Sequence, residues 1–229
     1  MKGSSGRVAL SARVDAGVLA ADALTEDEAL LRAGGPAARV GVLADTSISV
    51  GVGGNSGGAW FERARDHGLE PLRRRTGGSA VLHAPGDLVW SIVLPRGDPR
   101  VGPGFVHAYA RLGAPVARAL GEFGIEARWG APLALSEEYC ALSARGSVLL
   151  RGDRVVGGAA QHVSARALLH HGFLARRVEP EPLRAIFGLS PESIGRLTGW
   201  TETRPDLASE TLAAGIARSL AAGIEPSYG

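Results

Sequence analysis

The sequence predicts an α+β fold in which helices flank a mixed β-sheet. Short apolar runs rich in β-branched residues recur along the chain, as is typical of strands. Longer segments lie between them, and their apolar residues recur at three- and four-residue spacing, as in amphipathic helices. No internal repeat or low-complexity linker divides the 229 residues. We therefore expect one domain over 1–229, with a helical C-terminal part from about 180.

In the first half of the chain, two helices are expected among five strands. Helical spacing over 15–33 stops at Gly34-Gly35-Pro36, and a second helix over 59–68 begins near Trp60 and Phe61. A Pro85-Gly86 turn between two apolar runs predicts a β-hairpin. The strands expected here are 7–14, 39–43, 47–52, 80–83 and 88–94.

In the second half, one long helix precedes the remaining strands. The segment 105–121 places Tyr109, Leu112, Val116 and Leu120 on one stripe, with Pro115 inside it as a kink. Gly157 and Gly158 predict a turn that divides 154–162 into two strands. The other strands are expected at 125–129, 147–150 and 168–174, and helix caps at Ser190-Pro191, Thr201 and Ser209.

Composition excludes several classes of protein. A net charge of +2 is too mild to indicate nucleic-acid binding. No apolar run reaches the roughly 18 residues that would span a bilayer. The single cysteine, Cys140, cannot form an internal disulfide, which fits a reducing compartment. We expect a cytoplasmic protein that binds neither nucleic acid nor membranes.

One stretch carries most of the chemical signal. Three arginines at 73–75 lead through Thr76 into Gly77-Gly78, and Ser79, Ala80, Val81 and Leu82 then lead to His83. Glycines allow a backbone to approach a ligand closely, and free amide groups beside fixed cations suit a phosphate or carboxylate. An exposed basic turn is the alternative on these residues alone.

A second block lies downstream. It reads Gly152-Asp153-Arg154-Val155-Val156-Gly157-Gly158-Ala159-Ala160-Gln161, followed by Leu169-His170-His171-Gly172-Phe173-Leu174. The two blocks, in this order, resemble the signatures of the biotin/lipoate protein ligase and octanoyltransferase superfamily. With weaker similarity at 27–31 and 50–51, the resemblance covers most of 25–174. It implies the catalytic-domain fold of that superfamily, which is similar to class II synthetases.

The resemblance also implies a substrate pocket. Arg74, Thr76, Gly77, Gly78, Ser79, Ala80, Val81, Leu82 and His83 would form one part of it. Gly157, Gly158 and Ala159 would leave space for an acyl chain, and His171 and Gly172 would shape the pocket. The spacing of the histidines fits no zinc pattern, so no metal site is expected.

Two positions bear on catalysis. The family's lysine, which touches the acyl carbonyl, falls on Arg154, and this exchange is not conservative at a close-packed centre. Lysine occurs once, at Lys2, among the 25 lysines and arginines, so the whole chain favours arginine. Cys140 lies upstream of Arg154 at almost the spacing of the nucleophile in cysteine-dependent octanoyltransferases. A buried structural cysteine is the alternative.

Three functions follow from this resemblance. The first is transfer of an octanoyl or lipoyl group to the lysine of a lipoyl carrier domain, through a thioester on Cys140 and without a cofactor. The donor would be an acyl carrier protein or a lipoyl carrier domain. The second is an ATP- and Mg-dependent lipoate–protein ligase, although the Asn-Asp pair of ligases is absent near Cys140. The third is a non-catalytic relative that binds an acyl chain or nucleotide and acts as a carrier-protein partner or regulator.

Overall fold

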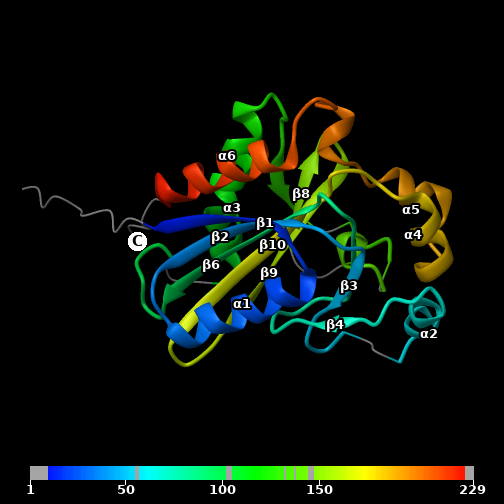
Figure 1. Ribbon diagram of the computed structural model, residues 1–229, viewed down its shortest axis with the longest axis horizontal. Coiled ribbons are helices and arrows are strands. Elements are labelled where there is room, and N and C mark those ends of the chain that lie inside the picture. The colour runs from blue at the N-terminus through cyan, green and yellow to red at the C-terminus, as the bar shows by residue number, and fades with distance from the viewer. Residues whose placement is uncertain are drawn as a thin grey trace, which may run out of the picture.

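A seven-stranded mixed sheet forms the centre of the protein, in the order β1-β2-β6-β10-β9-β8-β7 (Figure 1). The computed structural model describes residues 10–54, 57–101, 105–131, 133–136, 138–143 and 147–224, and only the backbone of 105–107. β1 and β2 run parallel, and the other neighbours run antiparallel. The strands are β1 (Ser11–Val18), β2 (Ala37–Leu43), β6 (Leu88–Pro95), β7 (Arg128–Gly130), β8 (Ser147–Arg151), β9 (Arg154–Val163) and β10 (Ala167–Leu174).

A second sheet of three strands lies beside the main one, in the order β4-β3-β5. Its strands are β3 (Ser47–Val50), β4 (Leu72–Arg73) and β5 (Ala80–His83). The expected hairpin of 80–83 with 88–94 is therefore wrong. β5 pairs with β3, whereas β6 pairs with β2 and β10. Every residue of β5 and most of β6 are buried, so both strands pack on both faces and their local pattern does not specify a partner.

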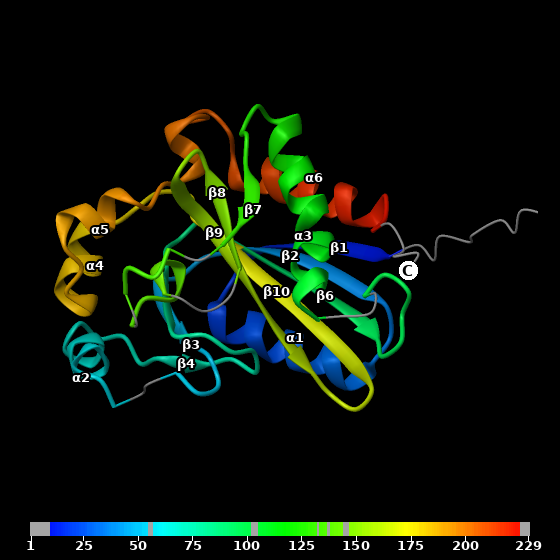
Figure 2. The same ribbon diagram turned by 180° about the vertical axis from the view of Figure 1, so that it is seen from behind.

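Helices cover the two faces of the main sheet. α3 (Phe105–Glu122) and α6 (Ser209–Ala221) pack on one face, and α1 (Ala20–Ala33) lies on the other, as the two views show (Figures 1 and 2). Three residues of the predicted stripe, Leu112, Val116 and Leu120, are fully buried against the sheet, whereas Tyr109 is only partly buried. The shorter helices α2 (Ala59–Asp66), α4 (Pro180–Phe187) and α5 (Pro191–Gly195) gather at one end of the molecule, next to the small sheet.

Two predicted boundaries shift. β1 continues to Val18, so α1 begins at Ala20 rather than at residue 15, and Gly34 ends it as expected with φ +72°. Residues 7–9 of the first predicted strand lie outside the described residues. Ser190 caps α5 by accepting from the Ser193 N–H, as predicted. Ser209 does not cap α6; its hydroxyl instead donates to the Gly86 carbonyl at 2.8 Å.

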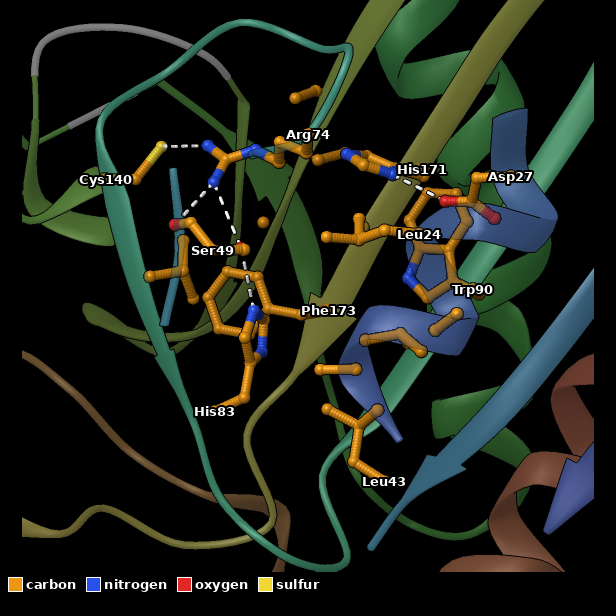
Figure 3. Close-up of a pocket in the computed structure, with 18 of the residues that line it drawn as sticks. Leu24, Asp27, Leu43, Ser49, Arg74, His83, Trp90, Cys140, His171 and Phe173 are labelled. Carbon is orange, nitrogen blue, oxygen red and sulfur yellow. Dashed lines mark hydrogen bonds and ion pairs between the residues drawn. The ribbon is translucent and has the colours of Figure 1, made fainter. Parts of the chain in front are cut away.

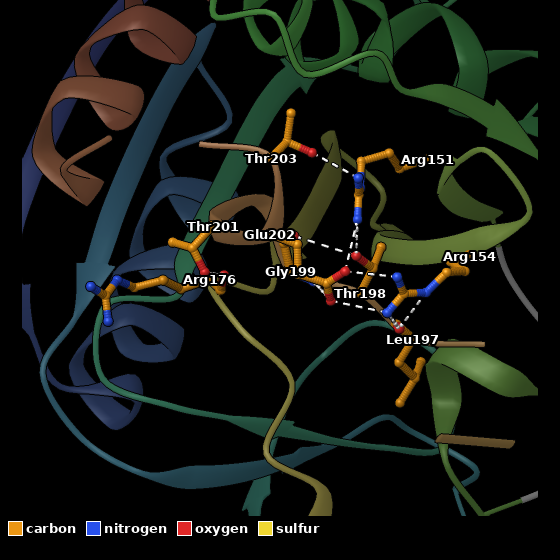
Figure 4. Close-up of polar contacts among 9 residues, drawn as sticks. All are labelled: Arg151, Arg154, Arg176, Leu197, Thr198, Gly199, Thr201, Glu202 and Thr203. Atoms are coloured by element: carbon orange, nitrogen blue, oxygen red, sulfur yellow. Dashed lines mark hydrogen bonds and ion pairs between the residues drawn. The ribbon is translucent and has the colours of Figure 1, made fainter. Parts of the chain in front are cut away.

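The expected glycine turn at 157–158 is also wrong, because β9 is one continuous strand. A Cβ on Gly157 would collide with the carbonyl oxygen of Phe173 on β10. The glycine is therefore needed for the close approach of two paired strands rather than for a turn. Thr201 lies in a short 3-10 helix (Trp200–Glu202), where it donates to the carbonyl of Arg176 at 2.7 Å (Figure 4).

Candidate active site

A mainly apolar pocket lies where α1, the main sheet and the small sheet meet (Figure 3). Apolar and small side chains from α1, β2, β6, β9 and β10 form most of its wall. The polar groups come from several elements: Ser49 and His83 of the small sheet, Arg74 just after β4, Cys140, and Asp27, Arg39, Ser147 and His171. The residues that line it are Ala20, Ala23, Leu24, Asp27, Arg39, Leu43, Ser49, Arg74, Val81, His83, Val89, Trp90, Cys140, Ala141, Ser147, Val148, Gly158, Ala159, Ala160, His171, Gly172 and Phe173.

Arg74 is the buried cation of this pocket, with 6% of the residue exposed. Its Nη1 donates to the carbonyl and hydroxyl oxygens of Ser49 at 2.8 and 3.1 Å. Its Nη2 donates to the carbonyls of Gly77 and Ser79 at 3.1 and 2.8 Å. Burial lowers the pKa of Arg74, and the neighbouring Cys140 opposes this shift. Within the described residues no carboxylate pairs with Arg74, so its charge is not neutralised, although both of its terminal nitrogens already donate to protein oxygens.

Cys140 faces this guanidinium, with its Sγ 3.7 Å from Nη2 of Arg74. The residues around the cysteine are fixed. Tyr139 forms a β-bridge with Ala80 of β5, and Leu142, in the same 3-10 turn (Cys140–Leu142), is fully buried. Cys140 itself is partly exposed. A rigid turn therefore presents a free thiol to the pocket beside an uncompensated cation, which are the surroundings of reactive cysteines.

Gly78 allows this contact. Its φ of +98° lies in the left-handed region that favours glycine. A Cβ built on Gly78 would lie 2.7 Å from Sγ of Cys140 and 2.9 Å from Nη2 of Arg74. Any side chain here would therefore push the thiol and the guanidinium apart.

A buried chain of hydrogen bonds forms another wall. Thr76 Oγ1 lies 2.6 Å from Nε2 of His171, and Nδ1 of His171 lies 2.9 Å from Oδ2 of Asp27. Nε of Arg39 donates to Oδ1 of Asp27 at 3.1 Å. Burial acts to raise the pKa of Asp27, but His171 and Arg39 outweigh it, so this pKa lies below its ordinary value. Both ring nitrogens of His171 are engaged, so the histidine fixes the glycine loop to α1 through Thr76.

His83 is a neutral histidine at the base of the pocket. It is buried, and its pKa falls to about 3, first because of burial and then because of the positive charge of Arg74. Its Nε2 lies 2.9 Å from the hydroxyl of Ser49. Since that hydroxyl already accepts from Arg74, its proton is free to point at the histidine. His83 therefore orients the serine that in turn positions the guanidinium.

Arg154 is not brought to the pocket. Its Nε and Nη2 donate to the carbonyl of Leu197 at 3.0 and 2.7 Å, and Nη1 and Nη2 contact the carboxylate of Glu202 (Figure 4). The segment 197–202 passes beside the start of β9, where Val155 bridges to Leu197. The expected place of Arg154 at the acyl carbonyl is therefore not found in this structure.

The other predicted residues divide into three groups. Arg74, Val81, His83, Cys140, Gly158, Ala159, His171 and Gly172 line the pocket. Thr76, Gly77, Gly78, Ser79 and Ala80 border it through the contacts above. Leu82 and Gly157 line a smaller neighbouring cavity instead.

Sequence reasoning missed Asp27, Ser49 and Trp90. A signal for Asp27 exists, because it shares one buried face of α1 with Ala20 and Ala23, where an acid is unexpected. Trp90 owes its place to Gly172, its partner across the β6–β10 pair, since a Cβ there would lie 2.5 Å from the indole.

Residues 30–198 match the model of the lipoyl protein ligase A/B catalytic domain, and the chain belongs to this family. The octanoyltransferase LipM of Exiguobacterium sp. is 29% identical over 127 residues, which are 52% of this chain and 46% of the relative. An octanoyl-[GcvH]:protein N-octanoyltransferase of Kyrpidia tusciae is 33% identical over 121 residues, covering 48% and 39%. These matches span about half or less of the relatives.

The fold is that of a solved lipoate-protein ligase A bound with ATP. The TM-score is 0.73 at 20% identity, over 94% of this chain and 88% of that chain. The predicted α+β class with a mixed sheet and flanking helices is thus confirmed.

Two kinds of feature are absent from the described residues. No group of three or more histidine, cysteine, aspartate or glutamate residues there is arranged to hold a metal ion. No helix in those ranges is both long and apolar enough to cross a membrane.

Proposed function

We propose that this protein transfers an octanoyl or lipoyl group to a lysine of a lipoyl carrier domain, with Cys140 as the nucleophile. The observation that carries the proposal is the 3.7 Å contact between the Cys140 thiol and the Arg74 guanidinium at the edge of an apolar pocket. The family membership and the octanoyltransferase names of the relatives support the acyl group.

In the first step, the Cys140 thiolate attacks the carbonyl carbon of an acyl thioester, and the donor leaves as its thiol. Arg74 pairs with the thiolate before the attack. The chain of the acyl group lies along Leu24, Leu43 and Trp90, where the pocket is apolar.

In the second step, the lysine amine of the acceptor attacks the Cys140 thioester. An amide bond forms, the carbon–sulfur bond breaks, and the amine proton that is lost restores the Cys140 thiol. No ATP is consumed, because the thioester already holds the acyl group in an activated form. Arg74 is the cation beside the reacting sulfur, whereas Arg154 is held by Glu202.

The second candidate is an ATP-dependent lipoate–protein ligase, because a ligase of this fold has been solved with ATP. A buried feature disfavours it. Both terminal nitrogens of Arg74 donate to protein oxygens, so this arginine presents no free fork to a phosphate.

The test is transfer from octanoyl-acyl carrier protein to an apo lipoyl domain, followed by mass spectrometry with and without ATP. We expect octanoylation of the lipoyl domain without ATP and none by Cys140→Ala. Octanoylation from free octanoate only when ATP is added would establish the ligase instead. Binding of octanoyl-acyl carrier protein without either product would indicate the non-catalytic alternative.

A further inference from the structure

A further hollow lies outside the pocket, between the C-terminal half of α1, the loop at Arg75 and the turn that joins β9 to β10. Its volume is about 440 Å³ and it is open to solvent. We name it the arginine groove. Figures 1 and 2 both show the β9–β10 turn beside the end of α1. The residues that line it are Glu28, Leu31, Arg32, Arg75, His162, Ser164, Ala165 and Arg166.

The arginine groove is positively charged. Three guanidinium groups, from Arg32, Arg75 and Arg166, line it beside one carboxylate. That carboxylate, Glu28, is shared, since it lies 3.1 Å from Nε of Arg75 and 3.6 Å from Nη1 of Arg32. Within the described residues, the guanidinium of Arg166 forms no ion pair. The three guanidinium charges therefore exceed the single carboxylate charge of the groove, and the remaining positive charge favours an acidic ligand.

The groove and the pocket are lined by adjacent residues of the same segments. Arg75 of the groove follows Arg74 of the pocket, and Glu28 follows Asp27. Gly78, which touches Cys140, is three residues from Arg75, so their Cα atoms are at most about 11 Å apart. The groove is therefore formed partly by the loop that also approaches the reactive thiol.

A fixed framework holds the groove. Leu30 and Leu31 of α1 pack on Val93, Ala167 and Leu169 of the main sheet. At the turn, the Ser164 hydroxyl accepts from the N–H groups of Arg166 and Ala167. The basic side chains therefore stand on a rigid base, as an interaction surface requires for a low ordering cost.

We propose that the arginine groove docks an acidic face of the carrier protein that donates the acyl group to Cys140. This rests on the proposed acyl transfer. The groove is wide and its charge lies on exposed side chains, which suits carboxylates on a protein surface. Long-range attraction between the two faces raises the rate of encounter and aligns the acyl arm with the pocket.

The test compares two donors, octanoyl-acyl carrier protein and the uncharged octanoyl-N-acetylcysteamine, in the double variant Arg32→Glu/Arg166→Glu. With the carrier protein, we expect kcat/KM for Cys140 acylation to fall by about tenfold or more, with less effect at high salt. With the uncharged thioester we expect the wild-type rate. Arg184→Glu, a charge reversal on α4 at the other end of the molecule, is the matched control and should change neither rate.

Equal losses with both donors, or no loss with the carrier protein, would overturn the docking proposal. Binding of fluorescently labelled acyl carrier protein is measured in parallel, since it does not need the reaction. If neither thioester acylates the wild type, the proposed function fails. The groove proposal is then supported if the double variant weakens carrier binding and Arg184→Glu does not. It is overturned if the double variant binds the carrier as the wild type does.

Discussion

Arg154 and Glu202 form a two-point ion pair, with Nη1 2.7 Å from Oε2 and Nη2 3.0 Å from Oε1. Both side chains are about one-third exposed, so the pair lies at the surface end of β9 rather than in the pocket. This contact holds the arginine at the position where the resemblance described above implies a lysine. Its planar fork matches the carboxylate, and the pocket already has a cation in Arg74.

The first prediction concerns Arg154→Lys. We expect Cys140 acylation to stay within about twofold of the wild-type rate, because the side chain contacts no group of the pocket. Loss of the fork should cost about 1 kcal/mol of stability or less, since exposed pairs contribute little. Single-turnover acylation and urea unfolding measure the two effects. A large gain in rate would show that this position acts at the acyl carbonyl.

Arg74→Met tests the buried cation. The change removes the charge beside Sγ of Cys140 and leaves the carbonyls of Gly77 and Ser79 without a donor. We expect alkylation of Cys140 by iodoacetamide at pH 7 to slow by about tenfold or more, and stability to fall by about 1–3 kcal/mol. Arg74→Lys keeps the positive charge but lacks the planar fork, so its alkylation rate should lie between those of the wild type and Arg74→Met. An unchanged alkylation rate in Arg74→Met would contradict the proposed role.

Gly78→Ala tests the close approach of the loop to the thiol. Both Gly78 and Gly68 have positive φ, of +98° and +73°, so alanine should strain either backbone by about 1–2 kcal/mol. Only at Gly78 does a Cβ meet Cys140 and Arg74, whereas nothing lies within 4 Å of one at Gly68. We therefore expect Cys140 acylation to be lost in Gly78→Ala and kept in Gly68→Ala. Equal activity of the two variants would refute this reading of the loop.

Stability should depend on pH through three buried groups. Burial lowers the pKa of His83 and of His170 to about 3 and raises the pKa of Asp87 to about 7. Each histidine stabilises the fold above its unfolded pKa near 6.5, and this contribution is lost as the pH falls toward 3. The contribution of Asp87 to stability has the opposite pH dependence. It is fully present below the unfolded pKa near 3.9 and is lost as the pH rises toward 7.

Between about pH 4.5 and 6, the unfolded chain thus binds one proton more than the folded chain, and stability should rise by about 1.4 kcal/mol per pH unit. His170→Gln removes one histidine from this balance, so its stability should be nearly constant over the same range. Urea unfolding at several pH values measures both slopes. Parallel slopes for the two proteins would show that His170 is not held neutral in the fold.

Much of this site could be predicted from the sequence. The glycine loop and the downstream block led to Arg74, His83 and His171, and the structure places all three at one pocket with Cys140. The helical periodicity of 105–121 was also sufficient to predict a helix and its buried face, because Leu112, Val116 and Leu120 recur along one face over several turns.

The pairing of strands could not be predicted in the same way. β5 and β6 are consecutive strands, yet they belong to different sheets. Their sequences do not indicate this, because both faces of each strand are mainly apolar and buried and so do not specify a partner. Gly157 likewise resembles a turn residue in sequence, and only the approach of Phe173 shows why it is glycine. The position of Arg154 depends on Glu202, which lies 48 residues further along the chain.

The most direct test of the central claim is the intact mass of the protein after incubation with octanoyl-acyl carrier protein in the absence of ATP. The account predicts one octanoyl group on the wild type, removed by neutral hydroxylamine as a thioester is, and no addition to Cys140→Ala. An unmodified wild type, or the same addition to Cys140→Ala, would contradict the assignment of Cys140 as the nucleophile.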